Sequence, residues 1–165
     1  MPLIRVGGAA LNQTPLDWNG NRDRIIAAVR EAREHGLAVL CLPELAVSGY
    51  GCEDAFQSPG LHRTALRVLG EILPETRGIV AALGLPVRFE SSLYDCVCLV
   101  ADGTVAGFVP KQHLAGDGIH YEPRWFRPWP RGRRGMVEVD LGEGSQRVPF
   151  GDLRFDVGGV RIGFE

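Results

Sequence analysis

The chain has 165 residues, of which 45% are hydrophobic and 23% are charged, a size and composition typical of one globular domain with its own core. A net charge of −2 gives no general attraction to nucleic acid or to anionic membranes. The N-terminus lacks a leader pattern, and no apolar run approaches the roughly 20 residues of a membrane-spanning helix. We therefore expect a cytoplasmic protein that binds neither nucleic acid nor membrane.

The first half of the chain predicts strands and helices in alternation. Strands are expected at residues 3–10 and 37–42, where apolar side chains dominate. A helix between them repeats apolar residues at three- and four-residue spacing, with asparagines of the preceding turn as caps and Gly36 at its end. A second helix is expected from Pro59 to Pro74. The order β, α, β, α favours the α/β class.

The second half predicts mainly antiparallel strands. An apolar strand at 79–87 should end at or soon after Pro86, and strands at 93–100 and 105–109 flank Asp102-Gly103, a strong hairpin signal. Residues 110–136 show no clean periodicity, and a loop of that length is usually functional or disordered. A last hairpin is expected from strands at 148–157 and 160–164.

Glu44 and Lys111 occupy equivalent positions in this pattern. Each directly follows a proline that ends an apolar strand, at the edge where open α/β sheets place their sites. A carboxylate there could accept a proton from a nucleophile, and an ammonium could stabilise a carbonyl oxygen that becomes negative. The alternative is two unrelated exposed charges, which is common for these residue types.

Short motifs around these residues resemble a known family. The Glu and Lys signatures of the carbon–nitrogen hydrolase (nitrilase) superfamily are similar to Leu42-Pro43-Glu44-Leu45 with Ser48-Gly49-Tyr50, and to Pro110-Lys111-Gln112-His113-Leu114. Within that superfamily, residues 50–54, 121–126 and 148–152 look like the amidotransferase domain of glutamine-dependent NAD synthetases. The resemblance covers essentially the whole chain, but only the front portion of such an enzyme.

The resemblance implies an α-β-β-α sandwich, in which two mixed sheets pack face to face with helices outside. Residues 1–165 would supply the N-terminal half to two thirds of this one domain, with no second domain in the chain. The family uses a Glu–Lys–Cys triad, which makes Glu44 the general base and Lys111 the oxyanion stabiliser. The sequence ends just before the position expected for the cysteine. Substrate binding is expected from Tyr50, Glu122, Phe126 and Glu165.

By resemblance, the domain hydrolyses the side-chain amide of L-glutamine and passes the ammonia to a synthetase domain of the same polypeptide. That second domain would use ATP and Mg²⁺, whereas this one is expected to need no cofactor and to hold no metal, since His113 and His120 lack a third ligand. A homo-oligomer is also expected. Two alternatives remain open: a stand-alone amidase for another small amide, and a non-catalytic module of the same fold.

The cysteines and a basic loop complete the candidates. Without a C-x-x-C pair, the cysteines predict neither a zinc site nor a disulfide framework. Cys52, expected to be exposed near Glu44, is the only one that could replace the missing nucleophile, although its acidic neighbours Glu53 and Asp54 would raise its pKa. Arginines interleave with aromatic residues over 124–134, which favours an interdomain or subunit contact over nucleic-acid binding.

Overall fold

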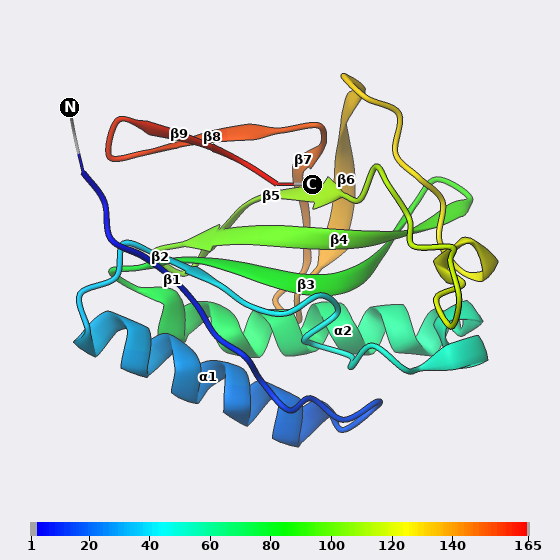
Figure 1. Cartoon of the computed structure of the whole chain (residues 1–165), viewed down its shortest axis with the longest axis horizontal. Coiled ribbons are helices and arrows are strands. Elements are labelled where there is room, and N and C mark those ends of the chain that lie inside the picture. Colours follow the sequence, from blue (N-terminus) through cyan, green and yellow to red (C-terminus); the bar gives the residue numbers. More distant parts are fainter. Residues whose placement is uncertain (1–2, 165) are drawn as a thin grey trace.

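The computed structural model describes residues 3–164 and is built on one large mixed sheet of seven strands, in the order β1-β2-β3-β4-β5-β7-β6 (Figure 1). These strands are β1 (Val6–Gly8), β2 (Val39–Cys41), β3 (Val80–Phe89), β4 (Ser92–Ala101), β5 (Thr104–Pro110), β6 (Arg134–Asp140) and β7 (Ser145–Gly151). β1, β2 and β3 run parallel, and β4 pairs antiparallel with both β3 and β5. β7 is parallel to β5 and antiparallel to β6.

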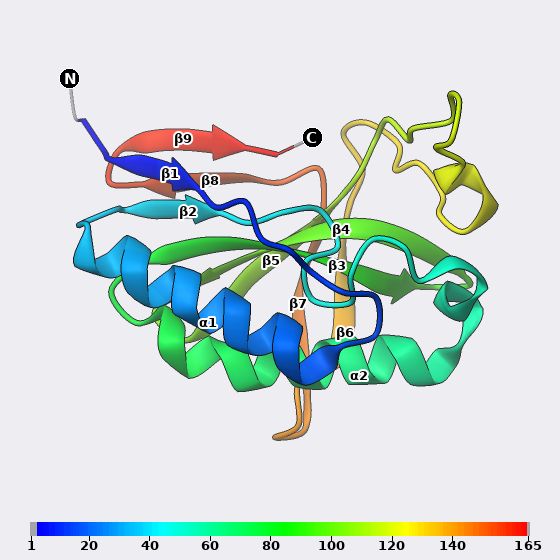
Figure 2. The same cartoon turned by 60° about the horizontal axis from the view of Figure 1, so that its bottom comes forward.

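Two helices cover one face of this sheet, and the separate hairpin of β8 (Arg154–Val157) and β9 (Val160–Gly163) lies on the other side (Figures 1 and 2). α1 spans Trp18–Glu34 and α2 spans Pro59–Ile72. The helices of the described part, residues 3–164, include none with the length and apolar character needed to cross a bilayer. This arrangement confirms the α/β class predicted from the order of the elements.

Short 3₁₀ helices connect the main elements: η1 (Glu53–Gln57), η2 (Leu73–Thr76) and η3 (Glu122–Arg124). The cap of α1 differs from the prediction, because Asp17 rather than an asparagine accepts the hydrogen bond from the Gly20 N–H, at 3.1 Å. Asn21 is buried inside the first turn instead, where its side chain bonds to both backbone polar groups of Thr14.

Side chains of β3 point alternately to the core and to the site. Alternate residues from Ala81 to Val87 are buried in the core that contains the apolar residues of α1 and α2. The intervening Ala82 and Gly84 line a cavity on the opposite face. Because side chains alternate across a pleated sheet, one strand contributes to both. The helices therefore fill one face, and chemistry is possible on the other.

Two strand predictions need correction, and one hairpin was missing from the prediction. β3 continues past Pro86 to Phe89, because β2 pairs only with Val80–Ala82 and the edge of β3 is open at the proline. The β6–β7 hairpin was not predicted. The expected single strand at 148–157 is two strands in different sheets, interrupted at Gly151, whose φ of 133° breaks the extended conformation.

Candidate functional site

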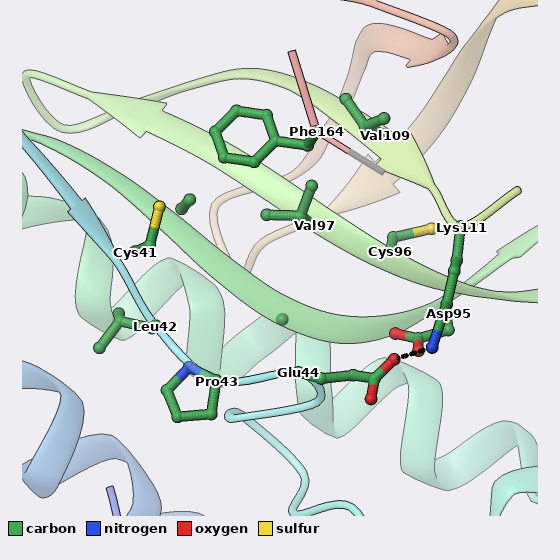
Figure 3. A pocket seen from close by; sticks show the side chains of 12 residues that line it. Cys41, Leu42, Pro43, Glu44, Asp95, Cys96, Val97, Val109, Lys111 and Phe164 are labelled. Carbon is green, nitrogen blue, oxygen red and sulfur yellow. Dashed lines mark hydrogen bonds and ion pairs between the residues drawn. The ribbon is translucent and has the colours of Figure 1, made fainter. Parts of the chain in front are cut away.

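Glu44 lies in a tight turn immediately after β2. The turn is closed by backbone hydrogen bonds from Ala46 to Pro43 and from Gly49 to Leu45, and Leu45 has a φ of 50°. The Val47 N–H donates to the Gly84 carbonyl at 3.1 Å, which ties the turn to β3. The Glu44 side chain points from this turn toward the end of β5 (Figure 3).

Lys111 follows β5, and its backbone N–H extends the sheet by donating to the Asp95 carbonyl at 2.8 Å. Its Nζ lies 2.5 Å from Oε1 of Glu44, so the structure brings the two predicted side chains together. Burial acts to lower the pKa of Lys111, but hydrogen bonds to Glu44 and Glu122 outweigh it and raise the pKa above its ordinary value. Lys111 is therefore held as a cation.

Glu122, in η3, supports Lys111 from the other side. Both of its carboxylate oxygens accept from Lys111 Nζ, at 3.1 and 3.0 Å, and they also accept from the Tyr50 hydroxyl and the Ala115 N–H, each at 2.8 Å. Only 2% of Glu122 is exposed. Burial, followed by Glu122, raises the pKa of Tyr50 above its usual range. Tyr50 thus stays a neutral hydrogen-bond donor, and 41% of it is exposed at the edge of the site.

Asp95 is a site residue that the sequence analysis missed. It lies within β4 and is 3% exposed, with its carboxyl group beside that of Glu44 (Figure 3). Burial acts to raise the pKa of Glu44, but hydrogen bonds from Asp95 and Lys111 outweigh it and lower the pKa below the usual 4.5. The available signal was a single charged residue inside the apolar run 93–100.

Glu44 and Lys111 open onto a cavity of about 250 Å³ on the sheet face away from the helices (Figure 3). Apolar side chains form most of its remaining lining, among them Val97, Val109 and Phe164. An apolar cavity with a few charged groups at one end suits a small organic ligand that carries one polar reacting group.

The cysteines do not form a nucleophile with these groups. Cys52 was expected to be exposed and is instead 5% exposed, with its thiol directed to the carbonyls of Ser48 and Gly49. Burial raises the pKa of its thiol. Cys41 lines the cavity, but burial raises its pKa as well. A thiol of raised pKa is a poor nucleophile at neutral pH.

One predicted substrate-binding residue is buried away from the cavity, and another lies outside the described residues. Phe126 is 1% exposed and packs against Phe56, with ring centroids 5.0 Å apart, so its observed contacts are those of a core residue behind Glu122. Glu165 lies outside the described residues. Its predicted role, like those of the other site residues, stays a prediction.

The carboxyl groups of Glu44, Asp95 and Glu122 each offer an oxygen within 4.8 Å of the other two, a spacing at which oxygens can hold a metal ion. The ammonium group of Lys111 already bonds to Glu44 and Glu122. Two of the three carboxyl groups, those of Glu44 and Glu122, thus share the Lys111 ammonium as a cation.

Two arginines of the basic loop, Arg124 and Arg133, have partners within the chain. Arg124 forms two hydrogen bonds of 2.9 Å with the carboxylate of Asp54. Arg133 lies over the ring of Trp129, 4.7 Å from its centroid, and reaches Glu90 at 3.1 Å. These contacts fasten the loop 111–133 to η1 and to the end of β3. The expected contact with another domain or subunit stays a prediction.

Comparison with known proteins places this chain in a family. A model of the carbon-nitrogen hydrolase family matches residues 5–165. A glutamine-dependent NAD(+) synthetase of Saccharomyces cerevisiae is 36% identical over 159 residues, which are 91% of this chain and 22% of that protein. For the synthetase of Rattus norvegicus the identity is 33%, over 98% of this chain and 23% of the relative. The chain thus spans less than a quarter of the length of these relatives.

Solved structures give the same result. A glutamine-dependent NAD(+) synthetase from Cytophaga hutchinsonii matches with a TM-score of 0.92 and 46% identity, over 98% of this chain and 27% of that one. An amidase from Nesterenkonia sp. matches with a TM-score of 0.65 and 24% identity, over 86% of this chain and 53% of that one, and at this identity shares the fold alone. The predicted α/β sandwich is confirmed by these likenesses.

Proposed function

Because the chain belongs to the carbon–nitrogen hydrolase family, we propose that it forms part of the glutaminase unit of a glutamine-dependent NAD synthetase. The site supports this proposal by its composition, since it combines a carboxylate suited to accept a proton with a fixed ammonium beside it. The observation that carries the proposal is the contact of Lys111 Nζ with Glu44 at 2.5 Å, with Glu122 holding the same nitrogen.

In the proposed reaction, a cysteine located after residue 165 gives its thiol proton to Glu44. The thiolate attacks the side-chain amide carbon of glutamine, and Lys111 stabilises the negative oxygen that forms. The C–N bond then breaks, and Glu44 returns its proton to the departing nitrogen, which leaves as ammonia. Water hydrolyses the remaining thioester to glutamate and restores the thiol. Each step uses only the protons of the site, the substrate and the attacking water.

The intact protein would pass the ammonia to a synthetase domain of the same polypeptide, where ATP and Mg²⁺ would act. We propose that residues 1–165 are one incomplete domain, that this domain itself needs no cofactor, and that the intact protein is a homo-oligomer. The proposal of an incomplete domain is supported by the length of the relatives, since the chain covers less than a quarter of each.

The first test is to determine the coding sequence beyond residue 165. A cysteine within a few residues, followed by a synthetase domain, is the expected result. A complete amidase domain without any further domain would favour the alternative of a stand-alone amidase. A serine or alanine in place of the cysteine would favour a non-catalytic module.

The second test separates the two activities of the longer protein. Glu44→Ala should lower glutamine hydrolysis by about 10²- to 10⁴-fold, the usual worth of a general base. NAD synthesis from free ammonia should change little, because only the source of ammonia is affected. Equal loss of both activities would show that Glu44 has a structural role. Arg30→Ala, at a surface ion pair of α1 with Glu75, is the control and should change neither activity.

A further inference from the structure

Asp95 is a buried acid for which the proposed reaction has no role. It is 3% exposed, and its Oδ2 has no hydrogen-bond donor among the described residues. Its carboxyl group lies beside that of Glu44 (Figure 3), and an oxygen of each lies within 4.8 Å of the other. Ionised carboxylates only accept hydrogen bonds, so two carboxyl groups placed this close can bond to each other only if one of them carries a proton.

The surroundings of the two groups decide which one is protonated. Glu44 contacts the Lys111 ammonium, and 37% of its side chain is exposed, so its negative charge is both paired and solvated. Asp95 is buried and has no cation on its side chain within the described chain. A buried charge without a partner is costly, and a neighbouring carboxylate adds to that cost. The proton therefore belongs on Asp95.

We propose that Asp95 is a protonated hydrogen-bond donor that, together with Lys111, positions the Glu44 carboxylate to accept the proton of a nucleophile. Asp95 is a positioning residue, since it acts through Glu44 and touches no reacting atom. The positioning role rests on the proposed function, whereas the location of the proton does not.

The charged and titratable groups around Asp95 support this assignment. Burial is the first cause that raises the pKa of Asp95 well above 3.8, and Glu44 is the second. Lys111 acts in the opposite direction, and Glu122 adds to the rise. Cys96, its neighbour in β4, is a buried thiol whose own pKa is raised by burial and then by Asp95, so it adds no charge.

Infrared spectroscopy of the 165-residue chain tests the location of the proton. The chain has 20 carboxylic side chains, and exposed ones are ionised at pH 7, so a protonated carboxyl band at that pH is distinctive. We expect this band in the wild type and in the control Asp117→Asn, whose residue is exposed, and not in Asp95→Asn. In Glu44→Gln, the pH at which the band disappears should fall by about one unit or more, because a neighbouring negative charge has been removed.

A wild type without the band, a band that persists in Asp95→Asn, or a Glu44→Gln variant with unchanged titration would overturn the proposal. If Asp95→Asn does not fold, a titration of ¹³C-labelled aspartate carboxyl groups in the wild type gives the same assignment. A normal pKa for every aspartate in that titration would then refute it.

Kinetics of the longer glutaminase test the positioning role. Asp95→Ala should lower kcat by about 10²-fold, the scale of an error in placing a catalytic group, with little change in KM. The decrease in kcat of Asp95→Asn should be at least tenfold smaller, because its amide can donate a hydrogen bond to Glu44. The wild type should also lose kcat at alkaline pH as Asp95 ionises, and Asp95→Asn should lack that loss. A structural role alone would leave the pH profile of Asp95→Asn unchanged, and this result would refute positioning.

The two experiments separate the two proposals. Absence of glutamine hydrolysis in the longer protein would refute the proposed function and with it the positioning role. The infrared result would still decide whether Asp95 holds a proton against Glu44.

Discussion

The substitution Gly84→Ala tests whether direct backbone contact places Glu44. Gly84 lies on β3 beneath the turn, and a Cβ at this position would lie 2.6 Å from the Pro43 carbonyl oxygen and 2.9 Å from the Glu44 carbonyl carbon. Because these are backbone atoms, no side-chain rotation relieves the clash. Forcing extra volume into a packed site usually costs about 1–3 kcal/mol. At roughly 2–4 °C per kcal/mol for a chain of this size, the melting temperature should fall by about 2 to 12 °C.

A matched control is available at Gly70 in α2, where a Cβ would clash with the Leu141 carbonyl oxygen, on the helix-covered side of the sheet. Gly70→Ala should therefore destabilise the protein without moving Glu44. Thermal unfolding measures both costs, and a ¹³C carboxyl titration reports on Glu44. Its pKa, held below 4.5 by Asp95 and Lys111, should rise in Gly84→Ala and not in Gly70→Ala. If Gly84→Ala is as stable as the wild type, or destabilised with the Glu44 titration unchanged, the placement argument is wrong.

Three further predictions concern the isolated chain. It should show no glutaminase activity, and ammonia release that disappears in Cys52→Ser would identify Cys52 as a nucleophile that we have excluded. Burial, aided by Arg88, lowers the pKa of His62 from 6.5 to about 4. The free energy of unfolding should therefore decrease as pH falls from 6.5 to about 4. A His62→Leu variant that shows the same decrease would refute this origin. Because the folded-state pKa of Asp95 is raised, Asp95→Asn should gain stability over the wild type as pH rises above 3.8, unlike Asp117→Asn, and a constant difference in unfolding free energy would contradict this.

The sequence predicted the positions of Glu44 and Lys111 because their signals are local. A proline ends the apolar run before each residue, and the ends of neighbouring strands meet at one edge of the sheet. The contact of Lys111 Nζ with both Glu44 and Glu122 depends on how the loop after β5 folds back. No periodicity in residues 110–136 gives that path, and only the family resemblance pointed to Glu122.

Asp95 illustrates a different limit. A charged residue within an apolar strand is a visible signal, but the sequence does not say which buried group faces it. That depends on register: Asp95 pairs with Pro86 on β3, two residues from Gly84, whose backbone holds the Glu44 turn. A shift of one residue would direct Asp95 into the helix-covered core. The pairing of β3 with β4 thus decides whether the residue belongs to the site.

The β6–β7 hairpin was missed for a third reason. Buried and exposed residues do not alternate regularly along both of its strands. The turn between the strands contains Gly142 and Gly144, both with positive φ, and its sequence does not stand out from the loop before β6. β7 joins the sheet beside β5 through a single register pair, Phe108 with Phe150. Phe150 is fully buried and stacks on Phe89, with centroids 4.6 Å apart. Long-range aromatic packing, rather than local pattern, therefore fixes this edge of the sheet.

In the proposed reaction, the arrangement lets Lys111 act twice without moving far. Before the reaction its charge is shared between Glu44 and Glu122. When Glu44 accepts the thiol proton it becomes neutral, and its attraction for the ammonium weakens while that of Glu122 persists. The N–H of Lys111 that donated to Glu44 can then donate to the oxyanion that forms in the same step. A neutral Asp95 makes this sequence possible, because an ionised carboxylate at that position would compete for the same ammonium group.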